Sequence, residues 1–393
     1  MATAFQLTEE QGALLREARR LGGSDLKQAS DTGEPGRVNR NLLGALARSG
    51  LLPRLFPSSA GGARPDESVS ALELCVLREG LAIECTDAET ALAMQGLGGY
   101  VLLMAAGPEV IRRWVPPIAR GEAIAAFALS EPEHGSDAGA IELRAVRDEG
   151  LPGYRLTGEK TWISNAPDAD VYVVFARTTE DAGARGVTAF VVPGDSAGLS
   201  GQSLELVGSH PIGRLQFDQV AVTDEQVVGD IDGGFAIAMR TLDLFRPSVG
   251  AFAVGMAQAA LEQATKYAQA RHAFGRPIRQ FQAISHRLAE MATQTEAARL
   301  LVYSAAGRYD AGGGRDPAVT RTSAMAKLFA TETAQWVVDA AVQIAGASGL
   351  QRGTLLEHLY REVRAPRIYE GTSEIQREII ARELFRGSAG AGV

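Results

Sequence analysis

The sequence predicts an α+β multidomain protein in which a central β domain lies between two α-helical domains along the chain. Helical spacing of apolar residues marks both ends of the chain, whereas β-branched and aromatic runs separated by turn residues fill the middle. A chain of 393 residues is also long for one core, since domains commonly hold about 100–200 residues. We therefore expect an N-terminal α-helical domain at 1–122, a middle β domain at 123–232 and a C-terminal four-helix bundle at 233–393.

The N-terminal region is predicted to be helical with short connections. Thr8 and Gln11 have the spacing of a capping box and precede the amphipathic run 13–21. Helical periodicity resumes over 66–84, and the Pro116-Pro117 pair is expected to end the helical region.

One stretch of this region, 90–108, carries no charge and is borderline in length for a spanning helix. Its glycines and polar residues favour a buried helix and turn, so no membrane span is predicted.

The middle region is predicted to be a β domain because apolar runs are bounded there by Gly- and Asp-rich turns. The expected strands are 154–157, 170–177, 186–193 and 214–223.

The last third of the chain contains four long helical segments joined by short loops, which favours an antiparallel bundle. These segments are 234–273, 281–311, 315–346 and 371–386. The chain shows no βαβ repeat, which excludes a doubly wound sheet.

Composition excludes several classes of function. The net charge of −8, from 39 Lys and Arg against 47 Asp and Glu, offers no basic surface for nucleic acid. Two cysteines, Cys75 and Cys85, cannot form a disulfide framework and favour a reducing compartment. The first residues lack a targeting pattern, so a cytoplasmic location is expected. His286 and Glu290 share a helix face but have no third ligand nearby, and no metal site is predicted.

Four segments carry candidate chemistry, each with a plainer alternative. Residues 127–137, FALSEPEHGSD, pass from an apolar strand into a turn rich in small donors, or form an ordinary β-turn. Alternation places Trp162 and Ser164 on one face, where they could cover an aromatic ligand, or Trp162 is a core residue. Residues 271–282, RHAFGRPIRQFQ, join two helices and either cap a helix or bind a pyrophosphate.

The fourth segment surrounds Glu370. Ser373 and Gln376 have capping-box spacing, so a helix is expected to begin there, with Glu370 and Gly371 in the preceding loop. A carboxylate on such a loop, followed by a glycine that allows close approach to the backbone, has the position of a general base.

These segments together resemble the acyl-CoA dehydrogenase family of flavoproteins. ALSEPEHGSD, KTWISN, RHAFG, QIAGASG and RIYEGTSEIQ occur in family order across nearly the whole chain. The resemblance implies an α-helical domain, an antiparallel β-barrel-like domain and a four-helix bundle. It also implies FAD as cofactor and oxidation of an acyl-CoA to the trans-2-enoyl thioester. A carboxylate removes the α proton, a hydride passes from the β carbon to flavin N5, and electrons pass to an electron-transferring flavoprotein.

The resemblance assigns roles by position in this sequence. Glu370 matches the catalytic base, and a homo-oligomer, dimer or tetramer, is implied because one segment reaches a neighbouring subunit's cofactor. The matched cofactor residues are Phe127, Leu129, Ser130, Gly135, Ser136, Trp162, Ile163, Ser164, Arg271, Phe274, Gln282, Gln343, Gly346, Thr372 and Glu374. The matched substrate residues are Ser136, Asp243, Arg246 and Gly371.

Some positions depart from the family pattern. Phe245 occupies the place where some relatives carry their base, which argues against that arrangement here. Ala347 and Leu350 replace a usual glycine and aromatic beside the adenine contact. Three alternatives stay open: an acyl-CoA oxidase, a dehydrogenase of carrier-protein-linked acyl groups, and a catalytically retired binding protein. No motif identifies the acyl chain.

Overall fold

The computed structural model describes residues 7–65, 69–150, 152–312, 314 and 316–389. The chain forms two compact units. The first comprises Met1–Gly23, Ser70–Glu89 and Asp243–Val393, and the second comprises Ser24–Val69 and Thr90–Leu242. The outermost residues of the first and third predicted domains, 1–6 and 390–393, lie outside the described residues, and the predicted domain boundaries stay predictions.

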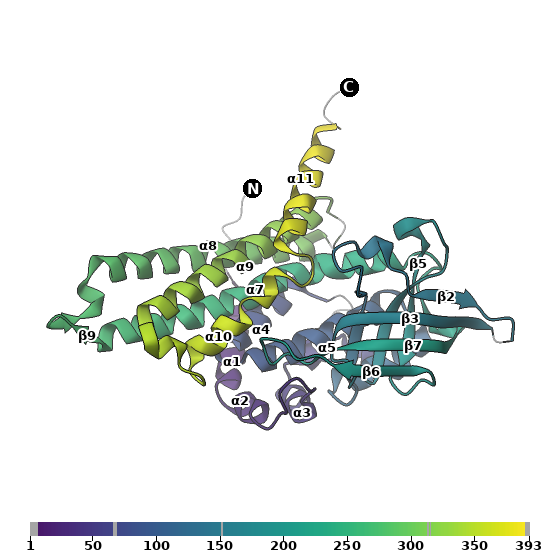
Figure 1. The fold of residues 1–393 in the computed structure, drawn as a ribbon, viewed down its shortest axis with the longest axis horizontal. Coiled ribbons are helices and arrows are strands. Elements are labelled where there is room, and N and C mark those ends of the chain that lie inside the picture. The colour runs from purple at the N-terminus through teal and green to yellow at the C-terminus, as the bar shows by residue number, and fades with distance from the viewer. Residues whose placement is uncertain (1–6, 66–68, 151, 313, 315, 390–393) are drawn as a thin grey trace. The chain divides into compact units, whose positions relative to one another are not determined.

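The first unit is built on long helices. They are α1 (Glu9–Gly22), α4 (Ala71–Glu84), α8 (Gln282–Gly312), α9 (Val319–Ala345), α10 (Leu355–Glu362), α11 (Ser373–Ala389) and most of α7 (Gly234–Ala270). Helix α9 packs on α8, α10 and α11, while α4 packs on α1 and α8. Figure 1 shows α8, α9 and α11 in green to yellow. The four predicted long helices are confirmed.

Close helix packing in this unit depends on small residues. Helix α7 lies so near α4 that a Cβ added to Gly255 would meet the Cβ of Ala82 at 2.6 Å. The buried face of α9 is dominated by alanine, which leaves room for long side chains from neighbouring helices. Two long charged side chains of this unit are also buried, Arg78 of α4 and Lys327 of α9 itself, which are 1% and 0% exposed.

The second unit contains an eight-stranded sheet. Its strands are β1 (Ala125–Ala128), β2 (Arg144–Arg147), β3 (Gly153–Ser164), β4 (Val171–Arg177), β5 (Val187–Pro193), β6 (Leu199–Ser203), β7 (Ile212–Thr223) and β8 (Val227–Val228). The order is β6-β7-β3-β2-β4-β5-β8, and β1 pairs with β4. Figure 1 shows β6, β7 and β3 side by side.

The sheet confirms each predicted strand and differs from the expected pairing in one respect. Most neighbours are antiparallel, but two pairs are parallel: β1 with β4 in the register Ala125↔Val171 to Ala128↔Val174, and β2 with β4 at Arg144↔Arg177. β4 and β5 are buried along almost their whole length, so they appear in the sequence as continuous apolar runs. β2 and β6 are short and mostly exposed, and the apolar pattern carries no signal for them.

The remaining helices of the second unit are α2 (Asp25–Ser30), α3 (Arg40–Arg48), α6 (Pro108–Ala119) and most of α5 (Thr86–Ala105). The uncharged stretch at 90–108 is helical over most of its length, as predicted. None of the helices in the described ranges is long and apolar enough to cross a membrane.

Two helix predictions need correction. Pro116 and Pro117 lie inside α6, which ends only at Ala119. Each proline removes an amide donor to the carbonyl four residues earlier, and α6 ends two residues after Pro117, so the pair ends the helix with a short delay. Helix α10 lies outside every predicted helical segment, because eight residues are too few for a clear apolar period.

Candidate active site

Glu370 lies in the loop between the short 3₁₀ turn Ala365–Arg367 and α11. Its φ is 53° and that of Gly371 is 91°, so both residues are left-handed. Within the described chain, the Oε2 atom of Glu370 is buried and has no hydrogen-bond partner. A buried carboxylate oxygen without a hydrogen-bond donor destabilises the folded state. The carboxylate of Glu370 therefore has a role other than packing.

Three cations surround this carboxylate. Burial raises the pKa of Glu370 above its usual value, and the positive charges of Arg78, Lys327 and Arg246 oppose that rise. Arg78 is itself held by an ion pair with Glu89, in which both side chains are buried. The arrangement keeps a desolvated carboxyl close to cationic groups, which is the environment of a tuned general base.

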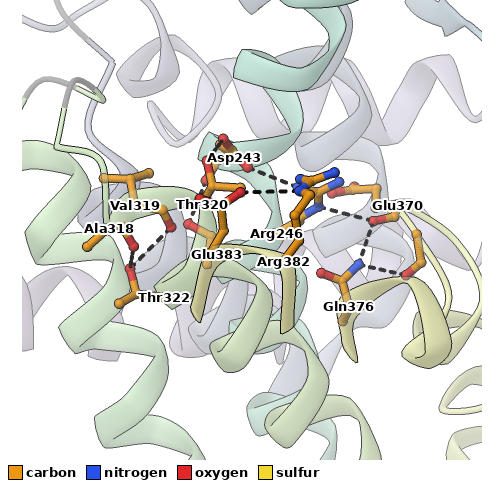
Figure 2. Close-up of polar contacts among 12 residues, drawn as sticks. Asp243, Arg246, Ala318, Val319, Thr320, Thr322, Glu370, Gln376, Arg382 and Glu383 are labelled. Carbon is orange, nitrogen blue, oxygen red and sulfur yellow. Dashed lines mark hydrogen bonds and ion pairs between the residues drawn. The ribbon is translucent and has the colours of Figure 1, made fainter. Parts of the chain in front are cut away.

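The backbone carbonyls of Glu370 and Gly371 are bound by side chains from three helices. The Nε2 of Gln376 in α11 donates to the Glu370 oxygen at 3.1 Å and to the Gly371 oxygen at 2.9 Å. The Nζ of Lys327 in α9 donates to the Gly371 oxygen at 2.7 Å. The Nε of Arg246 in α7 lies 3.4 Å from the Glu370 oxygen. Figure 2 shows Arg246 and Gln376 converging on Glu370.

These contacts correct the predicted capping box at Ser373. The backbone amide of Ile375 donates to the Thr372 hydroxyl at 3.3 Å, so Thr372 caps α11. The Gln376 side chain donates to the loop carbonyls, and Ser373 donates to Glu332 at 2.6 Å. Tertiary partners therefore replace the local reciprocal bonds that the spacing predicted.

Asp243 and Arg246 form one buried pair on α7. The Nη1 of Arg246 donates to Asp243 at 2.9 Å, and the Thr320 hydroxyl donates to the other carboxylate oxygen at 2.6 Å. Figure 2 shows this chain of contacts from Thr320 through Asp243 to Arg246. Burial raises the pKa of Asp243, while Arg246 and Thr320 lower it. Both residues lie next to the loop of Glu370, and their predicted contact with substrate stays a prediction.

The second unit holds the predicted flavin segments. Leu129 and Ser130 directly follow β1, and Leu129 accepts a hydrogen bond at 2.8 Å from the buried Lys160 of β3. Lys160 also pairs with Glu131 at 2.7 Å, and Glu131 accepts from the backbone amide of Leu143 at 2.9 Å. Sequence reasoning missed Lys160 and Glu131, because nothing in the KTWISN pattern shows that the lysine points inward.

Trp162 stands at a register shift between β3 and β7 and has a φ of 58°. A β-bulge bends the strand and redirects the side chain there. Trp162 is 54% exposed, Ser164 is half-buried and Ile163 is only 1% exposed. Because the register shift interrupts regular alternation, a shared face for Trp162 and Ser164 stays a prediction. The Ser164 hydroxyl lies 2.7 Å from Nε2 of His210, a neighbour that no sequence pattern indicated.

The segment 271–282 forms a small hairpin between α7 and α8. β9 (His272–Ala273) pairs with β10 (Arg276–Pro277), and Phe274 and Gly275 at its tip have φ values of 53° and 80°. Phe274 is 94% exposed and packs edge-on against Phe281. Arg271 and Gln282 are also exposed.

Most of the other matched residues lie near the ends of strands and helices. Phe127 is half-buried on β1, Gly135 and Ser136 are exposed on the loop after it, and Gln343 and Gly346 are exposed at the end of α9. Glu374 is exposed in the first turn of α11. A Cβ at Gly135 would meet no described atom within 4 Å, whereas one at Gly371 would meet Gln376 at 2.6 Å. The φ of 91° favours glycine at Gly371, whereas neither backbone nor space demands it at Gly135.

The chain matches three consecutive family descriptions: acyl-CoA dehydrogenase N-terminal domain at 8–122, middle domain at 126–220 and C-terminal domain at 232–385. The described fold is the helix, sheet and helix architecture of these flavoprotein oxidoreductases. This chain belongs to the acyl-CoA dehydrogenase family.

Individual relatives show the range of the family. Cyclohexane-1-carbonyl-CoA dehydrogenase of Geobacter metallireducens is 35% identical over 92% of this chain and 93% of its own length. Subunit CarC of the caffeyl-CoA reductase-Etf complex of Acetobacterium woodii is 36% identical over 90% of this chain and 92% of its own. A solved structure of PigA with FAD and proline has a TM-score of 0.89 and 27% identity, covering 97% of this chain and 99% of PigA.

FAD is the cofactor of this family, and the residues of this chain fit it. The bulge at Trp162 leaves a flat indole exposed two residues before Ser164, which suits a planar heteroaromatic ring. At the end of β1, the carbonyl of Leu129 is held by Lys160 and that of Ser130 by the amide of Thr161. The predicted contacts of single residues with FAD stay predictions.

Proposed function

We propose that this protein oxidises an acyl-CoA thioester to its trans-2-enoyl form and that Glu370 removes the α proton. The observation that supports this most is the buried, unpaired Oε2 of Glu370 among three cations. Burial raises the pKa of Glu370 and so makes its carboxylate a stronger base, while the cations limit that rise and keep the group ionised.

The α C–H bond is a very weak acid, so the thioester carbonyl has to be polarised as the proton leaves. The backbone N–H of Glu370 donates to no backbone carbonyl in the described chain, and the left-handed turn leaves it free for this purpose. Because one residue supplies both the base and this donor, substrate alignment depends on how firmly its backbone is held.

FAD, when bound, supplies the acceptor for the β hydrogen and its electron pair. Trp162 and Ser164 are proposed to hold the flavin ring, with Leu129 and Ser130 on the neighbouring strand end. The electrons are proposed to leave to an electron-transferring flavoprotein, as the name of the Acetobacterium woodii relative suggests for its own complex. Peroxide formed in air, compared with reduction of such a flavoprotein, separates this proposal from an oxidase.

The acyl group is proposed to be compact and branched or cyclic. The support for this is that one relative is named for a cyclohexane carboxylic thioester. The glycines after Cys85 do not add to it, because Ala125 and Phe56 fill the space beside Gly98 and Gly99. Anaerobic flavin bleaching across straight, branched, cyclic and aromatic acyl-CoAs tests this, with matching carrier-protein thioesters as a second panel. A preference for long straight chains contradicts it.

The test of the base is Glu370→Gln in the FAD-loaded protein. FAD stays bound in this variant. Because the amide cannot accept the α proton, the rate at which acyl-CoA bleaches the flavin absorbance falls by about 10³-fold or more. Glu378→Gln, on the exposed side of α11, is the matched control and keeps the parent rate. Unchanged bleaching in Glu370→Gln contradicts the proposal.

A homo-oligomer is also proposed. Phe274 is almost fully exposed at the tip of a hairpin with the rigid backbone of a two-residue turn, which is unfavourable unless another surface covers it. The hairpin is proposed to contact the cofactor region of a second copy of this chain.

A further inference from the structure

Lys327 is a buried lysine for which packing gives no reason. It lies in the middle of α9, is 0% exposed, and its Nζ donates to the Gly371 carbonyl at 2.7 Å. Taking an ammonium group out of water is costly unless the surroundings compensate. A leucine or methionine would fill the same space without that cost, so the amino group has a role of its own.

The charges that face Lys327 come from its own helix and three other elements. Burial, and to a smaller extent Arg246 of α7, lower the pKa of Lys327 to about 8. Glu370 in the loop, Glu332 of α9 and Glu374 of α11 act in the opposite direction and raise it. Below that pH the group is an ammonium ion beside the carboxylate of Glu370, and it is a hydrogen-bond donor in either protonation state.

The carbonyl that Lys327 binds belongs to the left-handed pair Glu370 and Gly371. A non-glycine residue with a φ of 53° is strained and persists only when its surroundings over-determine it. Lys327 and Gln376 both donate to the Gly371 oxygen, from different helices, at 2.7 Å and 2.9 Å. Two donors on one carbonyl fix the plane of the peptide group that follows Gly371 and so restrict the turn at Glu370.

We infer that Lys327 is a positioning residue for Glu370, because its bond to the Gly371 carbonyl fixes the left-handed backbone that aims the Glu370 carboxylate and N–H. The inference rests on the proposed role of Glu370 as base. Its second effect is electrostatic, since the ammonium group stabilises the ionised carboxylate before proton removal.

The experiment compares Lys327→Met with the parent in the FAD-loaded full chain. Acetyl-CoA has α hydrogens and no β hydrogen, so deuterium uptake into it from D₂O, measured by mass spectrometry, reports proton removal alone. A displaced base lowers this exchange and the rate of flavin bleaching by acyl-CoA by about ten- to hundredfold, with little change in KM. The pH at which exchange reaches half its maximum rises, because Glu370 loses one of its three cations.

Two further variants distinguish a displaced Glu370 from a general loss of folding. Lys266→Met removes an exposed lysine from α7 and leaves exchange, bleaching and melting temperature as in the parent. Gln376→Met removes the other donor to the Gly371 carbonyl and is expected to slow exchange in the same way. FAD content and the melting curve of each variant show whether it is folded.

The outcomes distinguish this inference from the proposed function. If Glu370→Gln keeps bleaching flavin, the proposed base is wrong. If Glu370→Gln is inactive but folded Lys327→Met and Gln376→Met exchange within about twofold of the parent, the positioning role is wrong. A lower melting temperature in both variants with unchanged exchange makes Lys327 purely structural and also overturns the inference.

Discussion

At the scale of single residues, backbone strain is concentrated on a few bulky side chains. Trp162, Phe274 and Glu370 have φ values of 58°, 53° and 53°. Such values are common for Asn and Asp but are outliers for large side chains, which fold only where neighbours enforce them. The family resemblance assigns all three to the cofactor or the reaction, whereas Gln219, which also has a φ of 53°, has no assigned role. Strain by itself therefore does not mark a site, and the assignments stay predictions.

The substitution Gly371→Ala tests how strongly the left-handed backbone of this loop limits the stability of the folded state. The new Cβ combines a φ of 91° with a contact of 2.6 Å to Gln376, and we expect a loss of about 2–4 kcal/mol in the free energy of unfolding. Gly36→Ala is the matched control, because its φ is 72° and no atom lies within 4 Å of the added Cβ. Equal losses in the two variants, measured by denaturant titration, would show that the Gln376 contact is unimportant.

Arg78 gives a prediction about pH. Among the cations it has the largest opposing effect on the raised pKa of Glu370, so its removal raises that pKa further. Because the base acts only when ionised, the pH midpoint of flavin bleaching moves upward in the double variant Arg78→Met, Glu89→Gln. The double change avoids leaving Glu89 buried without its ion-pair partner. Glu89→Gln alone keeps the Arg78 charge and is expected to shift the midpoint less.

At the scale of elements, β3 and the segment after β1 are joined by a buried ion pair. The side chains of Lys160 and Glu131 are 0% and 5% exposed, and besides each other they bond the backbone of Leu129, Glu142 and Leu143. Burial lowers the pKa of Lys160 to about 8, against opposing effects from Glu131. The pair fixes the strand end where the family resemblance places flavin contacts.

This lysine makes stability depend on pH in a defined direction. Between about 8 and 10.5 the folded protein has released the Lys160 proton while the unfolded chain retains it, so the free energy of unfolding rises with pH. Lys327 contributes in the same window. In Lys160→Met, Glu131→Gln, the rise measured by denaturant titration between about pH 8 and pH 9, below the titration of ordinary tyrosines near 10, becomes smaller. A slope equal to that of the parent would mean that Lys160 does not cause the rise.

Predictability from sequence differed between elements for physical reasons. The long helices and β3, β4, β5 and β7 carry apolar periods over enough residues to be recognised. β2, β6 and α10 are short and partly exposed, so their pairing partners define them rather than their own pattern. Gln376 satisfies carbonyls of the preceding loop instead of its own helix end, which local spacing cannot reveal.

At the scale of the whole molecule, the exposed hairpin offers a test of the proposed assembly. Phe274→Asp is expected to weaken the oligomer, lower FAD content after purification and leave the monomer folded, because the side chain contacts little of its own chain besides Phe281. Sedimentation and the flavin absorbance ratio measure both effects. Val146→Asp, on an exposed β2 position, is the control. Retention of the oligomer and of FAD in Phe274→Asp contradicts the assembly proposal.

The sequence by itself determined the three-part order of helices, strands and helices, the family, the cofactor and the identity of Glu370 as candidate base. The order of elements follows from periodicity, and the rest from the family resemblance of short motifs whose residues are neighbours in the chain. Only the tertiary structure decided what surrounds that base. Arg78, Arg246, Lys327 and Gln376 come from four different helices, and nothing in their local sequence distinguishes an inward lysine from a solvated one. The cost of burying their charges is offset only by partners far away in the chain, so their role exists only after the helices pack.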